Sequence, residues 1–172
     1  MRITKNGAWL GALIILAFLA TRWFLFPLAS RNQRSVTAPS ATRLVATPAG
    51  REELEKFQGA WEFVSLEVDG DRKPDADFKK YTVVFRGDQW IVSEGTNIAA
   101  ETTIVLDPTA NPKSIDVFPP PGKGQPIHGI YLLEGDTLTI CDRGEDNGDR
   151  PAGFGTEPNS GLVLIVYKQA QR

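Results

Sequence analysis

Few side chains in this chain of 172 residues have the chemistry of an enzyme active site, since it holds one histidine and one cysteine. Any Ser-His-Asp or Cys-His arrangement must therefore use His128. His128 alternates with Ile127 and Gly129 in a strand-like run, and no Gly-x-Ser-x-Gly elbow occurs to present a nucleophile. We expect a surface or hydrogen-bonded strand histidine, and Cys141 as a small buried hydrophobe.

The densest group of candidate metal ligands is the acidic segment 142–149. Carboxylate oxygens on a flexible loop suit calcium, but the spacing fails the EF-hand pattern of acids or amides at the first, third and fifth positions and glycine at the sixth. A chain with one cysteine has no thiolate cluster either. We expect solvated loop charge, with no metal site and no cofactor.

Other short motifs have simpler explanations than catalysis. Gly122-Lys123-Gly124 lacks the upstream glycine and the Ser or Thr of a phosphate-binding loop. Arg86-Gly87-Asp88 spells an integrin-type tripeptide, but Gly-Asp is also what a hairpin turn requires. No spacing selects a carboxylate pair for glycoside hydrolysis. The sequence therefore predicts a protein that is not an enzyme and has no catalytic residue.

Charge is divided unevenly along the chain. Residues 1–50 hold six basic and no acidic residues, whereas the other 13 of the 19 basic residues accompany all 21 acidic ones. The acidic body would be repelled by nucleic acid, while a basic arm beside an apolar run suits an anionic membrane surface. We expect a membrane as a partner and no nucleic acid; the sequence names no protein partner.

Residues 1–29 form a membrane anchor or a signal segment, because an apolar run at 8–21 resumes after Arg22. As an uncleaved anchor, residues 8–28 are long enough to cross the hydrocarbon core. As a cleaved signal, the segment has a basic start but no convincing small-x-small cleavage site. We expect a single-pass membrane protein with its body extracytoplasmic, or a secreted body if the signal is cleaved.

The body, residues 51–172, reads as a series of short strands after a linker at 30–50 that is rich in Ser, Thr, Ala and Pro. Residues 51–57 suit one or two helical turns. Eight later runs are rich in Val, Ile, Thr and aromatics and are bounded by turn residues: 61–68, 81–86, 89–93, 99–106, 114–118, 127–133, 137–141 and 162–168. Gly87-Asp88 and Gly135-Asp136 predict two-residue hairpins. The fold class is therefore all-β, as a closed barrel or a sandwich.

Several of these runs are apolar on both faces, notably 130–133 and 162–167. A strand with one solvated face would alternate apolar and polar residues. We therefore expect the helical turns, a long loop or a partner to cover the outer faces. The long loop at 142–160 should fold over one end of the sheet.

The ordered motifs of the body resemble those of a known group of proteins. They are FQGAWEFVSLEVDG at 57–70, PKSIDV at 112–117, GIYLLEGDTLTIC at 129–141, RPAGF at 150–154 and SGLVLIVYK at 160–168. Together they look like a family of small, uncharacterised lipocalin-like domains typical of Planctomycetes. The resemblance implies an antiparallel lipocalin-like barrel of about eight strands, a bacterial source and no established activity. With the apolar N-terminal run, we expect the location to be a bacterial cell membrane.

The same resemblance gives Gly59 and Trp61 a structural role. In lipocalin-like barrels a Gly-x-Trp at the start of the first strand lets the chain pass tightly under the barrel, and the indole closes that end. A basic residue of the last strand commonly lies over the indole, which here implies Lys168, although lipocalins more typically use Arg. Without the resemblance, Trp61 is simply a core aromatic.

Two non-enzymatic functions remain open. In the first, the barrel holds a small apolar or amphipathic ligand, and Ala99, Ala100 and Gly129 leave room for it if they point inward. In the second, the barrel is filled and serves as a structural or interaction module of the cell envelope. The least favoured hypothesis is a hydrolase that uses His128. The sequence identifies no ligand-binding residue.

Overall fold

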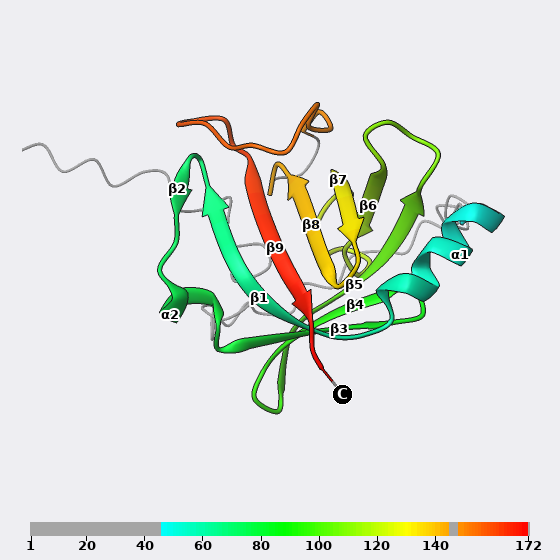
Figure 1. Cartoon of the computed structure of the whole chain (residues 1–172), viewed down its shortest axis with the longest axis horizontal. Coiled ribbons are helices and arrows are strands. Elements are labelled where there is room, and N and C mark those ends of the chain that lie inside the picture. Colours follow the sequence, from blue (N-terminus) through cyan, green and yellow to red (C-terminus); the bar gives the residue numbers. More distant parts are fainter. Residues whose placement is uncertain (1–45, 145–147, 172) are drawn as a thin grey trace, which may run out of the picture.

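The computed structural model describes residues 46–144 and 148–171. The predicted membrane segment 1–29 and residues 30–45 of the predicted linker lie outside these ranges. None of the helices within them is long and apolar enough to span a membrane. The described chain forms an antiparallel barrel preceded by a helix (Figure 1).

Helix α1, Pro48–Phe57, leads into the barrel. It begins where the hydroxyl of Thr47 accepts a hydrogen bond from the amide of Gly50, at 3.0 Å, and where proline occupies the first turn. Because this cap lies in the segment predicted to be a linker, the helix starts three residues earlier than expected. Its last residue, Phe57, is fully buried in the barrel.

Nine antiparallel strands make up the sheet, in the order β2-β1-β3-β4-β5-β6-β7-β8-β9. They are β1 (Gly59–Val68), β2 (Asp71–Arg72), β3 (Tyr81–Arg86), β4 (Gln89–Glu94), β5 (Asn97–Asp107), β6 (Ser114–Phe118), β7 (Ile127–Glu134), β8 (Thr137–Asp142) and β9 (Val163–Gln169). β9 also pairs with β1, so eight strands close into a barrel and β2 adds to the far end of β1.

The eight predicted strands are confirmed to within two residues at each end. Two elements were not predicted, the two-residue strand β2 and the single turn α2 (Asp75–Phe78), because neither is long enough to show a period. The two predicted hairpins are also confirmed. Gly87 and Gly135 stand first in their turns with φ of +60° and +59°, a conformation that glycine adopts without strain.

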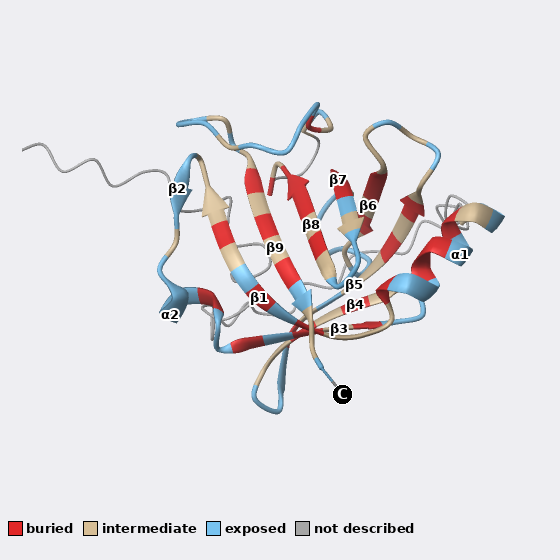
Figure 2. Cartoon of the chain, in the orientation of Figure 1, coloured by how far each residue is buried: buried red, intermediate tan, exposed pale blue. Residues whose placement is uncertain are grey.

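Alternate residues of each strand face the barrel interior, where the buried apolar side chains form the core. Figure 2 shows buried residues alternating with less buried ones along β9. Leu138 and Ile140 of β8, for example, face inward beside Leu133 and Tyr131 of β7. This alternation decides whether a candidate residue on a strand points into the barrel or outward.

The outer face of β7 and β8 is covered by the described part of their connection to β9. Ile130 and Cys141 form an outward-facing pair there, and both are fully buried. The amide of Gly155 hydrogen-bonds to Cys141, and Arg150 donates to backbone carbonyl groups of β6 and β7. The expected cover by the long loop is confirmed here, and Cys141 is the small buried residue that the sequence predicts.

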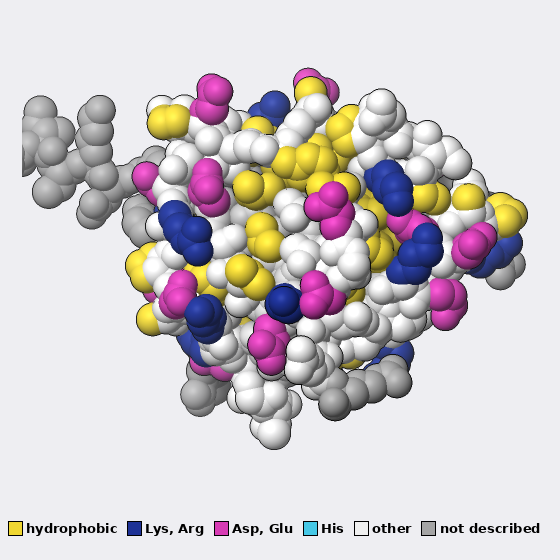
Figure 3. Space-filling model, in the orientation of Figure 1, with side chains coloured by type: hydrophobic (Ala, Val, Ile, Leu, Met, Phe, Trp, Pro, Cys, Tyr) yellow, Lys and Arg dark blue, Asp and Glu magenta, His cyan; other side chains and the backbone are white. Residues whose placement is uncertain are grey.

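The outer face of β9 has less cover. Leu164 and Val166 are only half-buried there, between β1 and β8. Figure 3 shows apolar side chains interspersed with charged ones on this side of the barrel. The cover expected for residues 162–167 is therefore incomplete within the described chain.

Candidate ligand-binding cavity

One end of the barrel is filled by aromatic side chains where α1 enters it. Trp61 is fully buried, and its indole N–H donates a hydrogen bond to the carbonyl oxygen of Phe57 at 2.7 Å. The ring of Phe57 packs edge-on against Phe85 and Tyr131, with centroid distances of 5.4 and 5.3 Å. The structure therefore places Trp61 in a closed, filled end of the barrel.

The two residues between Phe57 and Ala60 shape this entry. Gly59 has φ of +111°, which residues with a side chain rarely adopt, and β1 begins there. Gln58 is the C-cap residue that follows α1. Its side-chain amide makes two hydrogen bonds with the backbone of Gly87, at 2.7 and 3.0 Å. The end of the helix is thus tied to the β3–β4 turn, a contact that the sequence motif does not reveal.

Lys168 does not lie over Trp61, and that expectation is wrong. Tyr167 faces the interior, so the next residue along β9 faces solvent, and 55% of the Lys168 side chain is exposed. Its ammonium group lies 3.4 Å from the carboxylate of Asp136 in the β7–β8 turn. The indole is sealed by α1 and by inward-facing aromatic rings, so a residue on the outer face cannot contact it.

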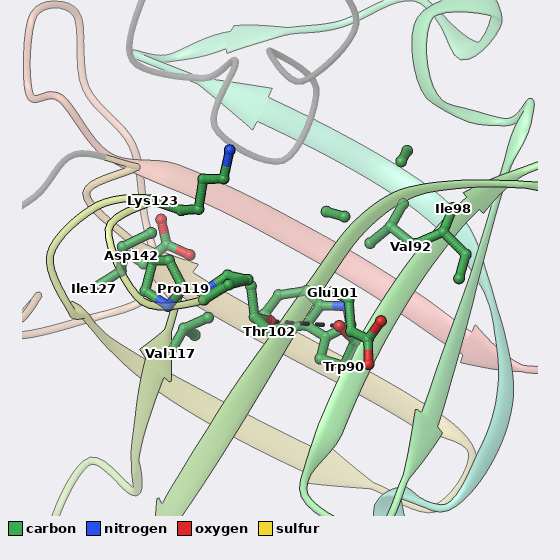
Figure 4. Close-up of a pocket in the computed structure, with 13 residues that line it drawn as sticks. Trp90, Val92, Ile98, Glu101, Thr102, Val117, Pro119, Lys123, Ile127 and Asp142 are labelled. Carbon is green, nitrogen blue, oxygen red and sulfur yellow. Dashed lines mark hydrogen bonds between the residues drawn. The ribbon is translucent and has the colours of Figure 1, made fainter. Parts of the chain in front are cut away.

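Another part of the barrel interior is open. A cavity of about 180 Å³ lies among β4, β5, the end of β6, the start of β7 and the end of β8 (Figure 4). Its rim includes the exposed residues Ile98, Glu101 and Lys123, so the cavity opens to solvent. Its inner wall is mainly apolar and contains Trp90, Val92, Ala100, Val117 and Ile127.

Small residues help to leave this space open. Ala99 and Ala100 both line the cavity, as the ligand-binding hypothesis expects. Gly129 does not line it directly but faces Asp142, and so makes room for that side chain.

Asp142, the last residue of β8, presents a carboxyl group to the cavity. It is 5% exposed, and it faces inward because it continues the alternation of Leu138 and Ile140. Burial raises the pKa of Asp142 to about 6, although the amide of Gly144 opposes this by donating to the carboxylate at 2.7 Å. None of the ion pairs within the described ranges includes Asp142. A buried carboxyl without a counter-ion is more typical of binding sites than of structural cores.

Two other interior polar atoms have no hydrogen-bond partner among the described residues, the indole nitrogen of Trp90 and the hydroxyl of Tyr167. Trp90 lines the cavity, and its ring lies 6.3 Å from the ring of Tyr167. Burial raises the pKa of Tyr167, and the charge of Asp142 raises it further, so the phenol and the carboxyl are within electrostatic reach of each other. Because buried polar atoms are normally paired, both groups are unusual for the interior of a barrel.

No family model, curated protein or solved structure matches this chain. The likeness to a lipocalin-like family of Planctomycetes therefore stays a prediction from the sequence motifs.

His128 lies away from the cavity, on the outer face of β7. Its Nδ1 is 2.7 Å from the carboxylate of Asp116, which also accepts a hydrogen bond from Arg150 at 2.7 Å. His128 is thus the hydrogen-bonded strand histidine that its alternation with Ile127 and Gly129 predicts.

The acidic segment 142–149 is divided between different environments. Asp142 lies inside the barrel, whereas Asp149 lies in the outer connection, where its carbonyl oxygen accepts a hydrogen bond from Arg143. Glu145 and Asp146 fall outside the described residues. Among the residues that are described, no three His, Cys, Asp or Glu side chains come together as metal ligands.

The sequence motifs identify neither Trp90 nor Asp142 as a binding residue. Asp142 could be found from its phase, since positions 138, 140 and 142 of one strand must share a face. Trp90 carries no comparable signal, because inward aromatic side chains also fill the opposite end of the barrel.

Proposed function

We propose that this chain is a non-enzymatic binding protein whose barrel holds one small, largely apolar molecule. The observation that carries the proposal is the cavity of about 180 Å³ at one end of the barrel. Apolar cavities of about 150 Å³ accept a benzene-sized molecule. The ligand therefore has roughly the size of a single ring with a short substituent.

The architecture supports a lipocalin-like assignment of the body. An eight-stranded barrel is just wide enough either to be filled by side chains or to hold one small ligand. Here the end that α1 enters is filled, whereas the end of the barrel at Asp142 keeps a cavity. The alternative function, a filled structural module, suits the first end and does not explain the second.

The proposed location is the outer side of a bacterial cell membrane, with the barrel tethered by its N-terminal segment. The support for this is the apolar run at 8–28 and the linker that follows it. Tethering would hold the mouth of the barrel near molecules that cross or leave the bilayer. Protease accessibility of the body in intact cells tests the location, and protection of the body by the membrane would contradict it.

Native mass spectrometry of the full chain tests the binding proposal. Purified from its source cells, the protein should carry a reproducible extra mass of a small molecule that is lost on unfolding. The matched variants are Ala100→Leu, which fills part of the cavity, and Ala152→Leu, which adds the same side chain at an exposed position.

The two variants should differ in ligand retention. Ala100→Leu should lose the extra mass, because the larger side chain occupies the space next to Val92, whereas Ala152→Leu should keep it. Binding that is equal in both variants would contradict a ligand inside the barrel.

A further inference from the structure

The cavity combines an apolar wall with a single deeply buried carboxyl group. Asp142 lies on the inner wall together with Val117 and Ile127, while the other acidic lining residue, Glu101, is exposed at the rim (Figure 4). Glu101 accepts a hydrogen bond from the side chain of Gln89 at 2.8 Å, so it has a partner of its own. The buried acid is therefore the group that a ligand inside the cavity would meet.

We propose that the cavity binds a small organic amine, whose ammonium group pairs with the Asp142 carboxylate while its apolar body lies against Trp90 and Val117. This inference rests on the proposed binding function and specifies the ligand class. Removing a carboxylate from water is costly unless a cation or several donors replace the water. Asp142 has one backbone donor, the Gly144 amide, and an ammonium group would supply both charge and further hydrogen bonds.

The indole of Trp90 fits an amine with one additional polar group. The indole N–H of Trp90 is a donor without a partner among the described residues, so it can bind an acceptor atom on the ligand. An aromatic amine with a hydroxyl or ether oxygen has this combination of groups at the size that the cavity allows.

The charged and titratable groups around Asp142 come from three sides. Tyr167 faces it from β9, and Cys141, adjacent on β8, points to the outer face with its pKa raised to about 11 by burial. Arg143 is directed outward, where its guanidinium donates to the carbonyl groups of Asp149 and Ser160. Lys123 lines the cavity from the β6–β7 loop, and its ammonium points away from Asp142 in Figure 4. From β7, Gly129 brings no charge.

Three water-soluble probes of nearly equal size test the inference on the full chain: benzylamine, benzyl alcohol and benzoate. Isothermal titration at about pH 7.5 should give an affinity for benzylamine at least about tenfold higher than for benzyl alcohol, as expected for a hydrogen-bonded charge pair. Benzoate should bind more weakly than either. A preference for benzoate, or equal binding of amine and alcohol, would overturn the inference.

Two variants test whether Asp142 causes the preference for the amine over the alcohol. Asp142→Asn keeps an oxygen for the Gly144 amide but removes the charge, so amine affinity should fall about tenfold to that of the alcohol, whose own affinity should not change. Glu134→Gln removes an exposed charge on β7 outside the cavity and should keep the preference. Equal loss in both variants would show general attraction to an acidic surface and would contradict a specific role for Asp142.

A pH series on the native chain provides a second readout that needs no variant. Because burial raises the pKa of Asp142 to about 6, the amine preference should decrease as the pH falls from about 7.5 to about 5, while alcohol binding stays constant. A preference that is unchanged at about pH 5 would contradict the inference. Failure of all three probes to bind, by contrast, would contradict the binding function itself.

Discussion

Gly129 and Asp142 face each other across adjacent strands so closely that one restricts the other. A Cβ atom on Gly129 would lie 3.2 Å from the Cβ of Asp142 and 3.0 Å from the carbonyl oxygen of Cys141. Both distances are tighter than ordinary contacts, and the second is to backbone. Because Gly129 of β7 has no side chain, β8 can end with the inward carboxyl group of Asp142.

The first prediction follows from this contact. Gly129→Ala should lower the free energy of unfolding by about 1–3 kcal/mol, because the added methyl group overpacks the wall between β7 and β8. The displaced Asp142 should also weaken amine binding. Gly153→Ala is the control, since a Cβ there meets no atom within 4 Å. Urea unfolding followed by circular dichroism measures the difference, and equal stability of both variants would contradict the close approach.

The second prediction concerns the dependence of stability on pH. The pKa of Asp142 is raised in the folded state, from 3.8 to about 6, so the folded chain binds this proton more tightly than the unfolded chain does. The stabilisation by protonated Asp142 is full below about pH 4 and is lost as the pH rises through about 6. Each pKa unit corresponds to about 1.4 kcal/mol, so the loss amounts to about 3 kcal/mol.

Asp142→Asn removes this titration. The stability of the variant relative to the native chain should rise by about 3 kcal/mol between about pH 3.5 and about pH 7.5. Urea unfolding at a series of pH values measures it without reference to any ligand. A difference between the two chains that does not change with pH would mean that the carboxyl group is solvated.

The third prediction compares the contributions of Trp61 and Lys168 to stability. Trp61→Ala should lower the free energy of unfolding by about 3–5 kcal/mol, because the indole is fully buried in the filled end of the barrel. Lys168→Ala should change it by less than about 0.5 kcal/mol, since the Lys168 and Asp136 side chains are both 55% exposed. A large loss of unfolding free energy in the lysine variant would instead support the predicted contact with Trp61.

Much of the barrel follows from local sequence features. The runs of Val, Ile and aromatic residues locate the strands, and Gly87 and Gly135 locate two hairpins because each turn needs a positive φ at its first position. Only the short elements β2 and α2 are not predicted, since two to four residues show no periodicity.

The cavity was harder to predict than the strands. It depends on which side chains point into the barrel and on how far each one reaches toward the opposite strands. The predicted contact of Lys168 with Trp61 rests on analogy, and the inward position of Tyr167 excludes it. The sequence spacing groups Asp142 with the acidic residues that follow it, whereas its phase with Ile140 places it inside the barrel. Whether the interior is hollow depends on how far Trp90 reaches between strands, which no local pattern records.

The last prediction concerns the attachment of α1 to the barrel. Glu53 is buried on α1, and its carboxylate accepts hydrogen bonds from Lys56 at 2.6 Å, Lys113 at 2.7 Å and the hydroxyl of Tyr131 at 3.2 Å. Burial alone would raise the pKa of Glu53, but the hydrogen bonds from Lys113 and Lys56 outweigh it and hold the pKa below its usual value. Glu53 therefore ties the helix that seals the filled end to β7 and to the residue before β6.

Glu53→Gln should lower the free energy of unfolding by about 1–3 kcal/mol near neutral pH, because two ammonium groups lose their charged acceptor. Since the folded pKa is depressed, this stabilisation is present above about pH 4.5 and is lost as the pH falls through the lower folded value, so the two chains should converge in acid. Glu55→Gln, on the exposed side of the same helix, is the control and should be neutral. Equal effects of the two substitutions in urea unfolding would mean that Glu53 does not help to hold α1 on the barrel.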